Sequence, residues 1–282
     1  MVKRIAVTGS EGKLGRYVVR ELNEYGYEVI GLDARPPESG NRYSRYMKLD
    51  LNRLGEVYAG LAGADAVIHL AAVPNPVEYA PERIFANNVL STYHVLEAAA
   101  RLGVGTAVIG SSESAYGFCW APEPFDPLYF PVDEEHPLLP RECYGLSKEV
   151  GESIGDMFSR RSGMRVFAMR FAHILAPEQY EKEIAAFADT RRHHRILWSY
   201  IDVRDAAAAC RLAVECGAEG SVRLDVTADD LLSDVPPAEL AARYYPGVGF
   251  RVPPERLAAL VSNRCAREAL GWKPVHSWKE YA

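Results

Sequence analysis

The chain has 282 residues, and its 38 acidic and 32 basic side chains give a net charge of -6 at pH 7. This length suits one large domain or one domain with a small lobe, and the negative balance argues against nucleic acid as the main partner. The 5 cysteines are dispersed without a Cys-x-x-Cys pair, which indicates reduced thiols and argues against a disulfide framework or a metal site. No apolar run is long enough for a membrane span, so we expect a cytoplasmic protein that makes no membrane contact.

The first predicted elements are a strand, a glycine-rich turn, a helix and a second strand. Ile5–Thr8 is a short apolar strand, the helix is predicted over Leu14–Tyr25, and the second strand is Glu28–Asp33. The turn reads Gly9-Ser10-Glu11-Gly12-Lys13-Leu14-Gly15. Its glycines allow the backbone to turn tightly and to approach a pyrophosphate, while the helix N-terminus supplies N–H donors. In this context the pattern predicts a dinucleotide site rather than a mere tight turn.

Two side chains at the end of the second strand bear on which dinucleotide binds. The carboxylate of Asp33 can hold the ribose diol of NAD and would repel the additional phosphate of NADP. Arg35 argues in the other direction, because a nearby arginine can receive that phosphate. We predict NAD as the cofactor, with NADP as the alternative.

Strands and helices continue to alternate along the first half of the chain. The next predicted segments are strands at Met47–Leu51, Asp65–Ala72 and Thr106–Gly110, with helices at Leu54–Leu61 and Glu82–Arg101. This alternation predicts an α/β fold of the Rossmann type, a doubly wound parallel sheet whose ligands bind at the carboxyl ends of the strands. Ser111 and Ser112 follow the last of these strands, so we expect them at that edge.

Tyr144 and Lys148 are four residues apart, so on a helix both side chains leave the same face. A free tyrosine has a pKa of about 10, and a nearby ammonium group lowers it. Such a pair can take a proton from an alcohol while a hydride leaves the same carbon. Taken alone, the spacing is also compatible with the start of an ordinary amphipathic helix.

Together these features resemble the extended short-chain dehydrogenase/reductases, the NAD-dependent epimerase/dehydratase family. The resemblance covers nearly the whole chain and rests on Thr8–Gly15, Asp33, Asp50-Leu51, His69-Leu70-Ala71-Ala72, Asn87, Ser111-Ser112, Tyr144 with Lys148, and Leu270-Gly271-Trp272-Lys273-Pro274.

What the resemblance implies can be stated residue by residue. It implies that Asp50 and Leu51 lie at the adenine. The residues that border the rest of the cofactor would be Leu70, Ala71, Ala72, Asn87 and Ser111. Ser112 would hold the substrate hydroxyl, Tyr144 would be the acid/base, and Lys148 would bind the nicotinamide ribose and tune Tyr144.

Residues 118–143 are rich in proline and aromatic side chains, which predicts a long loop over the site without regular structure. Its aromatic residues Trp120, Phe125 and Tyr129 either line the space for a sugar ring or pack the loop onto the body of the protein. Glu113 follows Ser112 directly, at a place where uronate dehydrogenases of the family carry a polar residue that touches substrate. We predict that Glu113 accepts hydrogen bonds from sugar hydroxyls, with a solvent-exposed or salt-bridged Glu113 as the alternative.

The segment after the predicted strand Arg165–Arg170 departs from the nucleotide-sugar enzymes of the family. His173 stands where those enzymes carry an asparagine that contacts a diphosphate, and Trp198 stands where they carry an arginine. These departures resemble the sugar and uronate dehydrogenases, which oxidise the anomeric carbon of a free monosaccharide. His173 is then a candidate substrate donor, unless it is a structural histidine.

The run Arg191-Arg192-His193-His194-Arg195 is either a site for a carboxylate or phosphate, or a solvated helix face. The pair His193-His194 lacks the spacing of metal ligands, so we expect no metal. Short helices at Pro236–Tyr245 and Arg256–Leu270 are expected to close the substrate side.

These predictions divide the chain into an NAD-binding domain over residues 1–170 and a small substrate-binding lobe over residues 171–282, interleaved with the end of the sheet. The resemblance also implies a homodimer, formed through the helices Glu82–Arg101 and Tyr144–Arg161.

The leading functional hypothesis is an NAD-dependent oxidoreductase that acts on a free sugar or sugar acid. Ser112, Glu113, Tyr144 and His173 would contact the substrate. The first alternative is an NDP-sugar 4-epimerase or dehydratase, which would use the same catalytic residues. The second, from another class, is a non-catalytic dinucleotide-binding regulator, because a fold does not fix a function.

Overall fold

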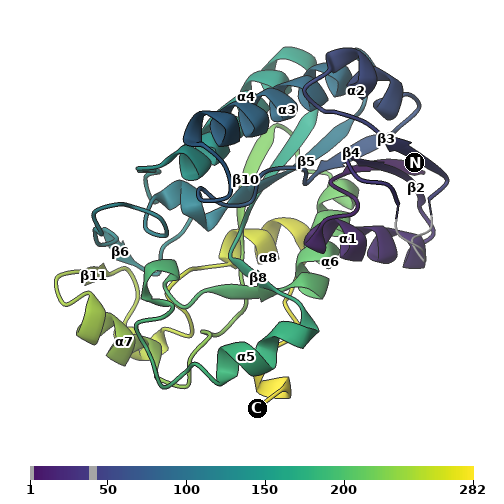
Figure 1. Ribbon diagram of the computed structural model, residues 1–282. Coiled ribbons are helices and arrows are strands. Elements are labelled where there is room, and N and C mark those ends of the chain that lie inside the picture. Colours follow the sequence, from purple (N-terminus) through teal and green to yellow (C-terminus); the bar gives the residue numbers. More distant parts are fainter. Residues whose placement is uncertain (1–2, 38–42) are drawn as a thin grey trace.

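A computed structural model describes residues 3–37 and 43–282 of the chain. Its centre is a seven-stranded sheet in the order β10-β7-β5-β4-β1-β2-β3, and every neighbouring pair is parallel (Figure 1). The strands of the sheet are β1 (Arg4–Thr8), β2 (Glu28–Asp33), β3 (Arg45–Lys48), β4 (Ala66–His69), β5 (Thr106–Ser112), β7 (Arg165–Phe171) and β10 (Ser221–Val226). The order reverses between β1 and β4, where a doubly wound sheet binds its ligand. The predicted Rossmann-type fold is confirmed.

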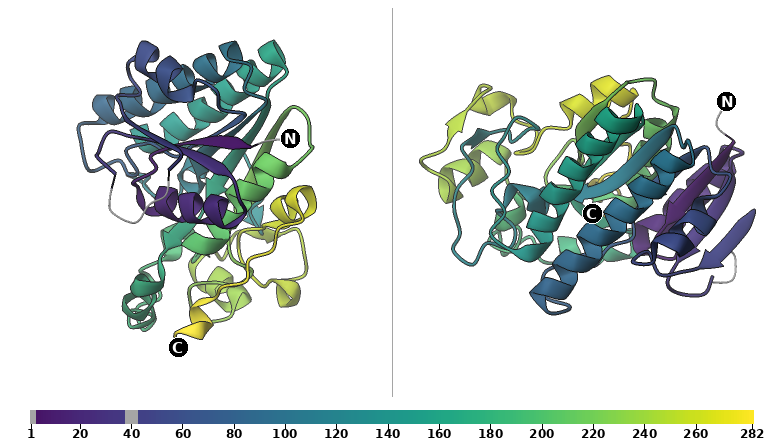
Figure 2. Two further views of the ribbon diagram at one scale, coloured as in Figure 1. Left: turned by 90° about the vertical axis from the view of Figure 1, so that its right-hand side faces the viewer. Right: turned by 90° about the horizontal axis from the view of Figure 1, so that it is seen from above.

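Helices cover both faces of the sheet. One layer consists of α2 (Leu54–Leu61), α3 (Pro81–Arg101) and α4 (Cys143–Ser162), and the other of α1 (Lys13–Glu24), α6 (Val203–Glu215) and α8 (Arg264–Leu270). Figure 2 shows the sheet between the two layers. The central strands are buried and mostly apolar because both faces are covered, whereas the edge strand β3 is only partly buried.

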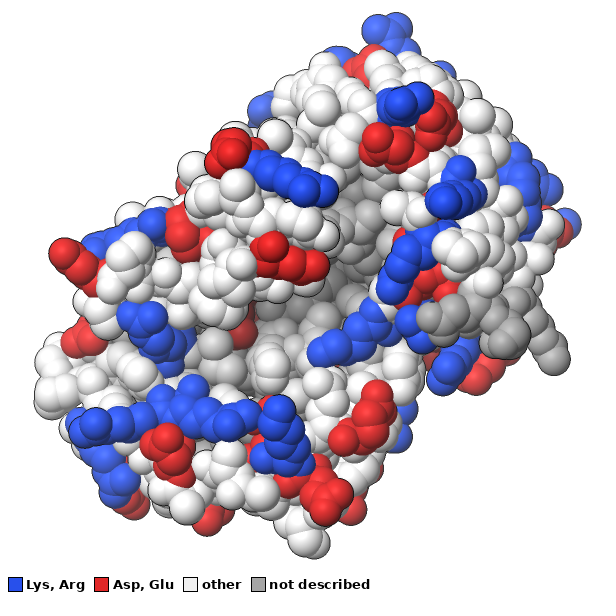
Figure 3. All heavy atoms as spheres, viewed as in Figure 1, with Lys and Arg blue, Asp and Glu red and all other residues white. Residues whose placement is uncertain are grey.

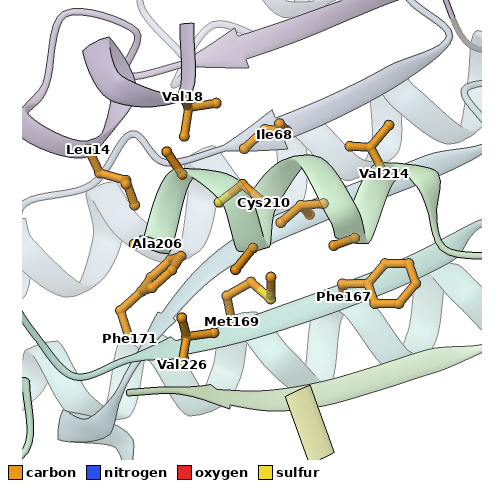
Figure 4. Close-up of a cluster of buried hydrophobic side chains, with 14 of the residues drawn as sticks. Leu14, Val18, Ile68, Phe167, Met169, Phe171, Ala206, Cys210, Val214 and Val226 are labelled. Carbon is orange, nitrogen blue, oxygen red and sulfur yellow. The ribbon is translucent and has the colours of Figure 1, made fainter. Parts of the chain in front are cut away.

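The packing beneath the sheet shows how α6 supports the site. Small side chains of α6, including Ala206 and Cys210, face α1 and the strands, where they meet Val18, Met169 and Phe171 (Figure 4). Full burial of a side chain such as valine or phenylalanine contributes about 1.5–3 kcal/mol. The close approach that the alanines allow fixes α1 and its glycine turn against the sheet.

The remaining elements form a smaller lobe beside the carboxyl ends of the strands (Figure 1). They are β6 (Tyr129–Phe130), β8 (His173–Leu175), α5 (Tyr180–Ile184), β9 (Tyr200–Asp202), α7 (Pro237–Tyr244) and β11 (Gly249–Phe250). The pairs β8–β9 and β6–β11 are short parallel ladders. An apolar cluster that contains Phe130, Trp198, Leu240 and Leu260 gives the lobe a core of its own.

Three predicted elements differ from the structure. The helix expected over Arg256–Leu270 exists only as α8, because Leu260 and Val261 are buried and pair with the backbone of Val132. The strand expected at Met47–Leu51 ends at Lys48, so Asp50 lies in a turn. The long loop at 118–143 is present, but it contains the two-residue strand β6.

No helix within residues 3–37 and 43–282 is long and apolar enough to cross a membrane. Over the same residues, the structure contains no cluster of three or more side chains that could bind a metal ion.

Candidate active site

A cavity of about 910 Å³ lies along the carboxyl ends of the strands, between the sheet and the lobe. Figure 3 shows the hollow on the face seen in Figure 1. Its main lining consists of Gly9, residues 12–15, 33–35, 49–52, 70–74, 110–114, 119–120 and 171–174, and the start of α4. Of the predicted site residues, Ser10 and Glu11 do not line the cavity and are buried within the glycine turn.

The glycine turn is packed so closely that side chains cannot be added. Gly9 has a φ of +67°, and a Cβ there would lie 2.8 Å from the backbone nitrogen of Ala71. A Cβ on Gly15 would lie 2.0 Å from the carbonyl oxygen of Gly9. The start of α1 therefore stands open toward the cavity with its N–H groups uncovered by side chains, which is the arrangement that a pyrophosphate requires.

Asp33 lies at the bottom of this half of the cavity and is almost buried. Its carboxylate accepts hydrogen bonds from the backbone N–H groups of Glu11 at 2.9 Å and Arg35 at 3.0 Å. The guanidinium of Arg35 lies 3.5 Å from the same carboxylate and also donates to the carbonyl of Glu11. The arginine that could receive an NADP phosphate is thus engaged with the carboxylate that would repel it.

The residues predicted to meet the adenine line the far end of the cavity. Asp50 lies in the turn after β3, where its side chain accepts a hydrogen bond from the backbone of Asn52 at 2.9 Å. Asn52 also donates to Asn87 of α3 at 3.2 Å, and Leu51 lies beside them. The turn and the helix are therefore linked at this end.

Leu70, Ala71 and Ala72 leave β4 directly into the cavity. His69 before them is buried and holds the strand end, since its ring nitrogens lie 2.7 Å from Thr8 Oγ1 and 3.2 Å from Thr92 Oγ1. Burial lowers the pKa of His69 to about 3, so the ring is neutral at physiological pH. Its role is structural.

The start of α4 is positioned by close backbone contact with the turn that follows β5. The side chain of Glu142 caps the helix by accepting the N–H of Gly145 at 2.6 Å. A Cβ on Gly145 would lie 2.4 Å from the carbonyl oxygen of Ser114. This approach brings Tyr144, on the first turn of α4, against Ser112 at the end of β5.

Ser112, Tyr144 and Lys148 converge in the cavity. Burial raises the pKa of Tyr144, and a hydrogen bond with Ser112 acts in the opposite direction. Lys148 Nζ lies 5.4 Å from the centre of the Tyr144 ring and donates to the carbonyl of Gly110 at 2.7 Å. Burial lowers the pKa of Lys148 to about 8. The pKa of Tyr144 is thus raised in the protein alone, and the lowering expected from Lys148 is not among the causes of the shift.

Ser111 is hydrogen-bonded to a buried network of charged side chains. Its hydroxyl donates to Glu152 at 2.6 Å, and Glu152 pairs with both ends of the Arg170 guanidinium at 2.9 and 2.7 Å. Arg170 donates further to Tyr116, which donates to Asp225 at 2.7 Å. Sequence reasoning missed this network, although Glu152 follows Lys148 by four residues and thus shares the helix face of Tyr144 and Lys148.

Glu113 lines the cavity and is neither solvent-exposed nor salt-bridged. The hydroxyl of Ser199, which precedes β9, contacts its Oε2 atom. Burial raises the pKa of Glu113 to about 8, and the contact with Ser199 lowers it by less. Ser199 was not among the predicted site residues, and no local pattern in the sequence marks it.

The aromatic residues of the loop at 118–143 were predicted either to line the space for a sugar ring or to pack the loop, and the structure contains examples of each. Trp120 lines the cavity and is 42% exposed. Phe125 packs on Phe118, with ring centroids 5.3 Å apart, and Tyr129 packs on His136 at 5.2 Å. Trp120 is therefore open to a ligand, whereas the other two pack the loop.

Comparison with known proteins places this geometry in a family. The model of the NAD dependent epimerase/dehydratase family matches residues 5–225. The chain belongs to this family.

Curated relatives within the family act on different forms of sugar. The L-arabinose 1-dehydrogenase (NAD(P)(+)) of Haloferax volcanii is 28% identical over 217 residues, which is 75% of this chain and 82% of the relative. A putative UDP-glucose 4-epimerase of Methanocaldococcus jannaschii is 30% identical over 185 residues, 63% of this chain and 58% of the relative. The uronate dehydrogenase of Pseudomonas putida is 30% identical over 169 residues, 59% of either protein.

The fold is shared with a short-chain dehydrogenase/reductase superfamily protein from Agrobacterium tumefaciens that was solved with bound NAD. The two superpose with a TM-score of 0.76 at 24% identity, covering 98% of this chain and 94% of the other. NAD is the cofactor of the family, and the residues of this chain fit it. The uncovered glycine turn suits the pyrophosphate, and the buried Asp33 suits the ribose.

His173 and Trp198, the two residues expected to depart from the nucleotide-sugar enzymes, lie in different parts of the structure. His173 lines the cavity, and burial lowers its pKa to about 4. Its ring lies 6.3 Å from that of His193, whose Nε2 atom lies 3.1 Å from a carboxylate oxygen of Glu183. Trp198 is buried in the core of the lobe, and its indole donates to the carbonyl of Thr190 at 3.0 Å.

The basic run is not the solvated helix face that was one of its two predicted forms. Its residues form a turn and a short 3-10 helix, and one of its two histidines, His193, is buried. Arg192 pairs with Glu183 at 3.2 Å, and Arg195 donates to the carbonyl of Ala121 at 2.9 Å. The run thus fastens the lobe, and only Ile196 after it reaches the cavity.

Lys13 of the glycine turn connects the two sides of the cavity. Its ammonium group donates to the carbonyl of Ile174 at 3.0 Å and to the side chain of Gln179 at 3.1 Å. Burial lowers the pKa of Lys13, and Glu178 opposes that shift. The sequence placed Lys13 at the cofactor, and the contact with the lobe is an addition from the structure.

Proposed function

We propose that this member of the family oxidises the anomeric carbon of a free sugar with NAD and releases a lactone. The observation that carries the proposal is the convergence of Ser112, Tyr144 and Lys148 in a cavity whose described lining includes His173, at the place where the resemblance leads us to expect the diphosphate-binding asparagine of a nucleotide-sugar enzyme. Trp198, at the place expected for the arginine of those enzymes, is buried. The similarity to an L-arabinose 1-dehydrogenase over most of both chains supports the same substrate form.

The chemistry divides between the cofactor and the chain. Bound NAD supplies the acceptor for the hydride. Ser112 holds the substrate oxygen, and Tyr144 takes the hydroxyl proton as the carbon–oxygen double bond forms. Because burial favours the neutral phenol, Tyr144 acts as a base only with positive charge beside it, and Lys148 is the side chain placed to provide that charge.

The second candidate function is 4-epimerisation of a nucleotide sugar, favoured by the similarity to a putative UDP-glucose 4-epimerase. It would use the same three residues, and the hydride would be returned to the substrate. The two functions therefore differ in whether NADH accumulates and in whether a diphosphate is bound.

The deciding experiment offers NAD with a panel of free aldoses and uronic acids and follows NADH absorbance, while UDP- and GDP-sugars are assayed in parallel for isomerised product. We expect net NADH with a free sugar and no change in the nucleotide sugars, with Tyr144→Phe as the inactive control. Isomerised nucleotide sugar without net NADH would replace the proposal by the epimerase. If neither class were converted while NAD still bound, the regulator hypothesis would take its place.

We further propose a cytoplasmic homodimer in which residues 1–170 bind NAD and residues 171–282 close the substrate side. Leu90 and Tyr93 on α3 and Leu146 on α4 are large apolar side chains at least 38% exposed, and the two helices lie side by side. They suit a contact between two copies of the chain. Light scattering should give twice the chain mass, and Leu90→Lys should shift the protein to monomer; a monomer in the unaltered protein would refute this.

A further inference from the structure

The cations that line the cavity all belong to its cofactor side. Among the described lining residues, the lysines and arginines are Lys13, Arg35 and Lys148. Lys13 donates to Ile174 and Gln179, Arg35 to the glycine turn, and Lys148 to Gly110. The shift in the pKa of Glu113 has burial and Ser199 as its causes, without a contribution from a positive charge. The substrate side therefore lacks a partner for an anion within the part of the chain that the structure describes.

Ser199 holds the carboxyl group of Glu113 in place. Its hydroxyl lies 2.7 Å from the carbonyl oxygen of Ile196 and donates to Glu113 Oε2. The Ile196 carbonyl also accepts the backbone N–H of Ser199 at 2.9 Å, which keeps this hydroxyl next to Glu113. Burial raises the pKa of Glu113 to about 8, so burial favours the protonated, neutral acid at neutral pH.

Glu113 leaves one carboxyl oxygen for the ligand. With Oε2 accepting from Ser199, the remaining oxygen, Oε1, is available for a hydrogen bond with a sugar. A sugar hydroxyl can donate or accept such a bond, whereas a sugar carboxylate at this place would find no lysine or arginine among the described lining residues of the substrate side. A partly buried charge without a partner costs free energy.

We propose that Glu113, held by Ser199, is a substrate-contacting residue that selects an uncharged sugar over the corresponding uronic acid. This inference rests on the proposed function and narrows its substrate class to neutral aldoses. In this arrangement Ser199 is a positioning residue, because it orients the carboxyl group without reaching the substrate.

The test compares kcat/KM for two matched pairs, galactose with galacturonate and glucose with glucuronate, whose members differ only at C6. The unaltered enzyme should prefer the neutral member by more than about tenfold. Glu113→Gln keeps a neutral acceptor and should keep the preference, whereas Glu113→Ala should raise KM for the neutral sugar about tenfold. Ser199→Ala should raise KM for the neutral sugar with little change in kcat. Glu24→Gln, which removes an exposed acid at the end of α1 outside the cavity lining, is the matched control and should change neither.

The outcomes separate this inference from the proposed function. Oxidation of the uronic acids as well as or better than their neutral partners would overturn the inference and leave the sugar dehydrogenase standing. Absence of NADH with every free sugar would overturn both. Independently of turnover, the infrared difference between the unaltered protein and Glu113→Gln at neutral pH should show the carbonyl band of a protonated carboxyl group, and a carboxylate band there would refute the assignment.

Discussion

The two halves of the cavity are built in different ways. The cofactor half is formed largely by backbone, by the glycine turn and by a strand end, and its cations lie within hydrogen-bond distance of backbone carbonyls. The substrate half is formed by side chains that come from segments far apart in the chain, as Glu113 and Ser199 do. A backbone-built site suits a cofactor that is common to a family, whereas a side-chain-built site can change with the substrate.

The largest effect is expected from a substitution at the proposed acid/base, Tyr144, which lies where the two halves of the cavity meet. Tyr144→Phe deletes the hydroxyl that takes the substrate proton, so turnover should fall by about 10²–10⁴-fold. The affinity for NAD, measured by fluorescence titration, should stay within about twofold because the cofactor half is untouched. A parallel collapse of NAD affinity would show that Tyr144 is structural and that the halves are not separable.

A smaller effect is expected from the addition of one methyl group to the glycine turn in the cofactor half. Gly15→Ala places a Cβ against the carbonyl of Gly9, and the displaced turn should destabilise folding by about 1–3 kcal/mol and weaken NAD binding. Gly55→Ala is the control, because a Cβ at this position of α2 meets no described atom within 4 Å and should stabilise the helix by about 0.5–1 kcal/mol. Urea titration without NAD measures the change in folding stability, and its repetition with NAD measures the stabilisation by NAD binding. Unchanged NAD binding in Gly15→Ala would contradict the assigned role of the turn.

The smallest effect concerns the substrate half and depends on pH. The folded-state pKa of Glu113, about 8, lies above the ordinary value of 4.5, so the unfolded chain loses its proton first as pH rises. Stability should therefore fall between about pH 4.5 and pH 8 and level off above this window. The titratable neighbours Tyr144 and Cys119 have raised pKa values and stay protonated there.

Glu113→Gln removes this dependence without changing the shape of the side chain. Relative to the unaltered protein, its Tm should rise by roughly 2–4 °C above pH 8 and change little near pH 4. Calorimetry of both proteins from pH 4 to above pH 8 measures these Tm differences. Equal Tm differences at both ends would mean that the pKa of Glu113 is the same in the folded and unfolded protein, which would contradict the rise caused by burial.

The features that were predictable from sequence are those encoded by neighbouring residues. The parallel sheet, the glycine turn and the acid at Asp33 follow from patterns within about thirty residues of one another, as in any βαβ unit. The pairing of Tyr144 with Lys148 follows from helical spacing alone. Whether these residues perform the assigned catalysis is still a prediction.

The features that escaped prediction depend on contacts between distant segments. Ser199 reaches Glu113 across 86 positions in sequence, and Arg195 holds the loop at Ala121 across 74. The helix expected over Arg256–Leu270 was shortened because Leu260 and Val261 pair with Val132. In each case tertiary contact decided the outcome, and no local pattern carries that information.

The contact of Lys13 with Ile174 and Gln179 bears on cofactor exchange. A dehydrogenase must release its reduced dinucleotide after every turnover, whereas an epimerase keeps it. Because the ammonium group comes from the turn that faces the pyrophosphate and its acceptors come from the lobe, the cavity cannot widen there without breaking both hydrogen bonds. Under the proposed function, NADH release by widening of the cavity at this point would require both hydrogen bonds of Lys13 to break.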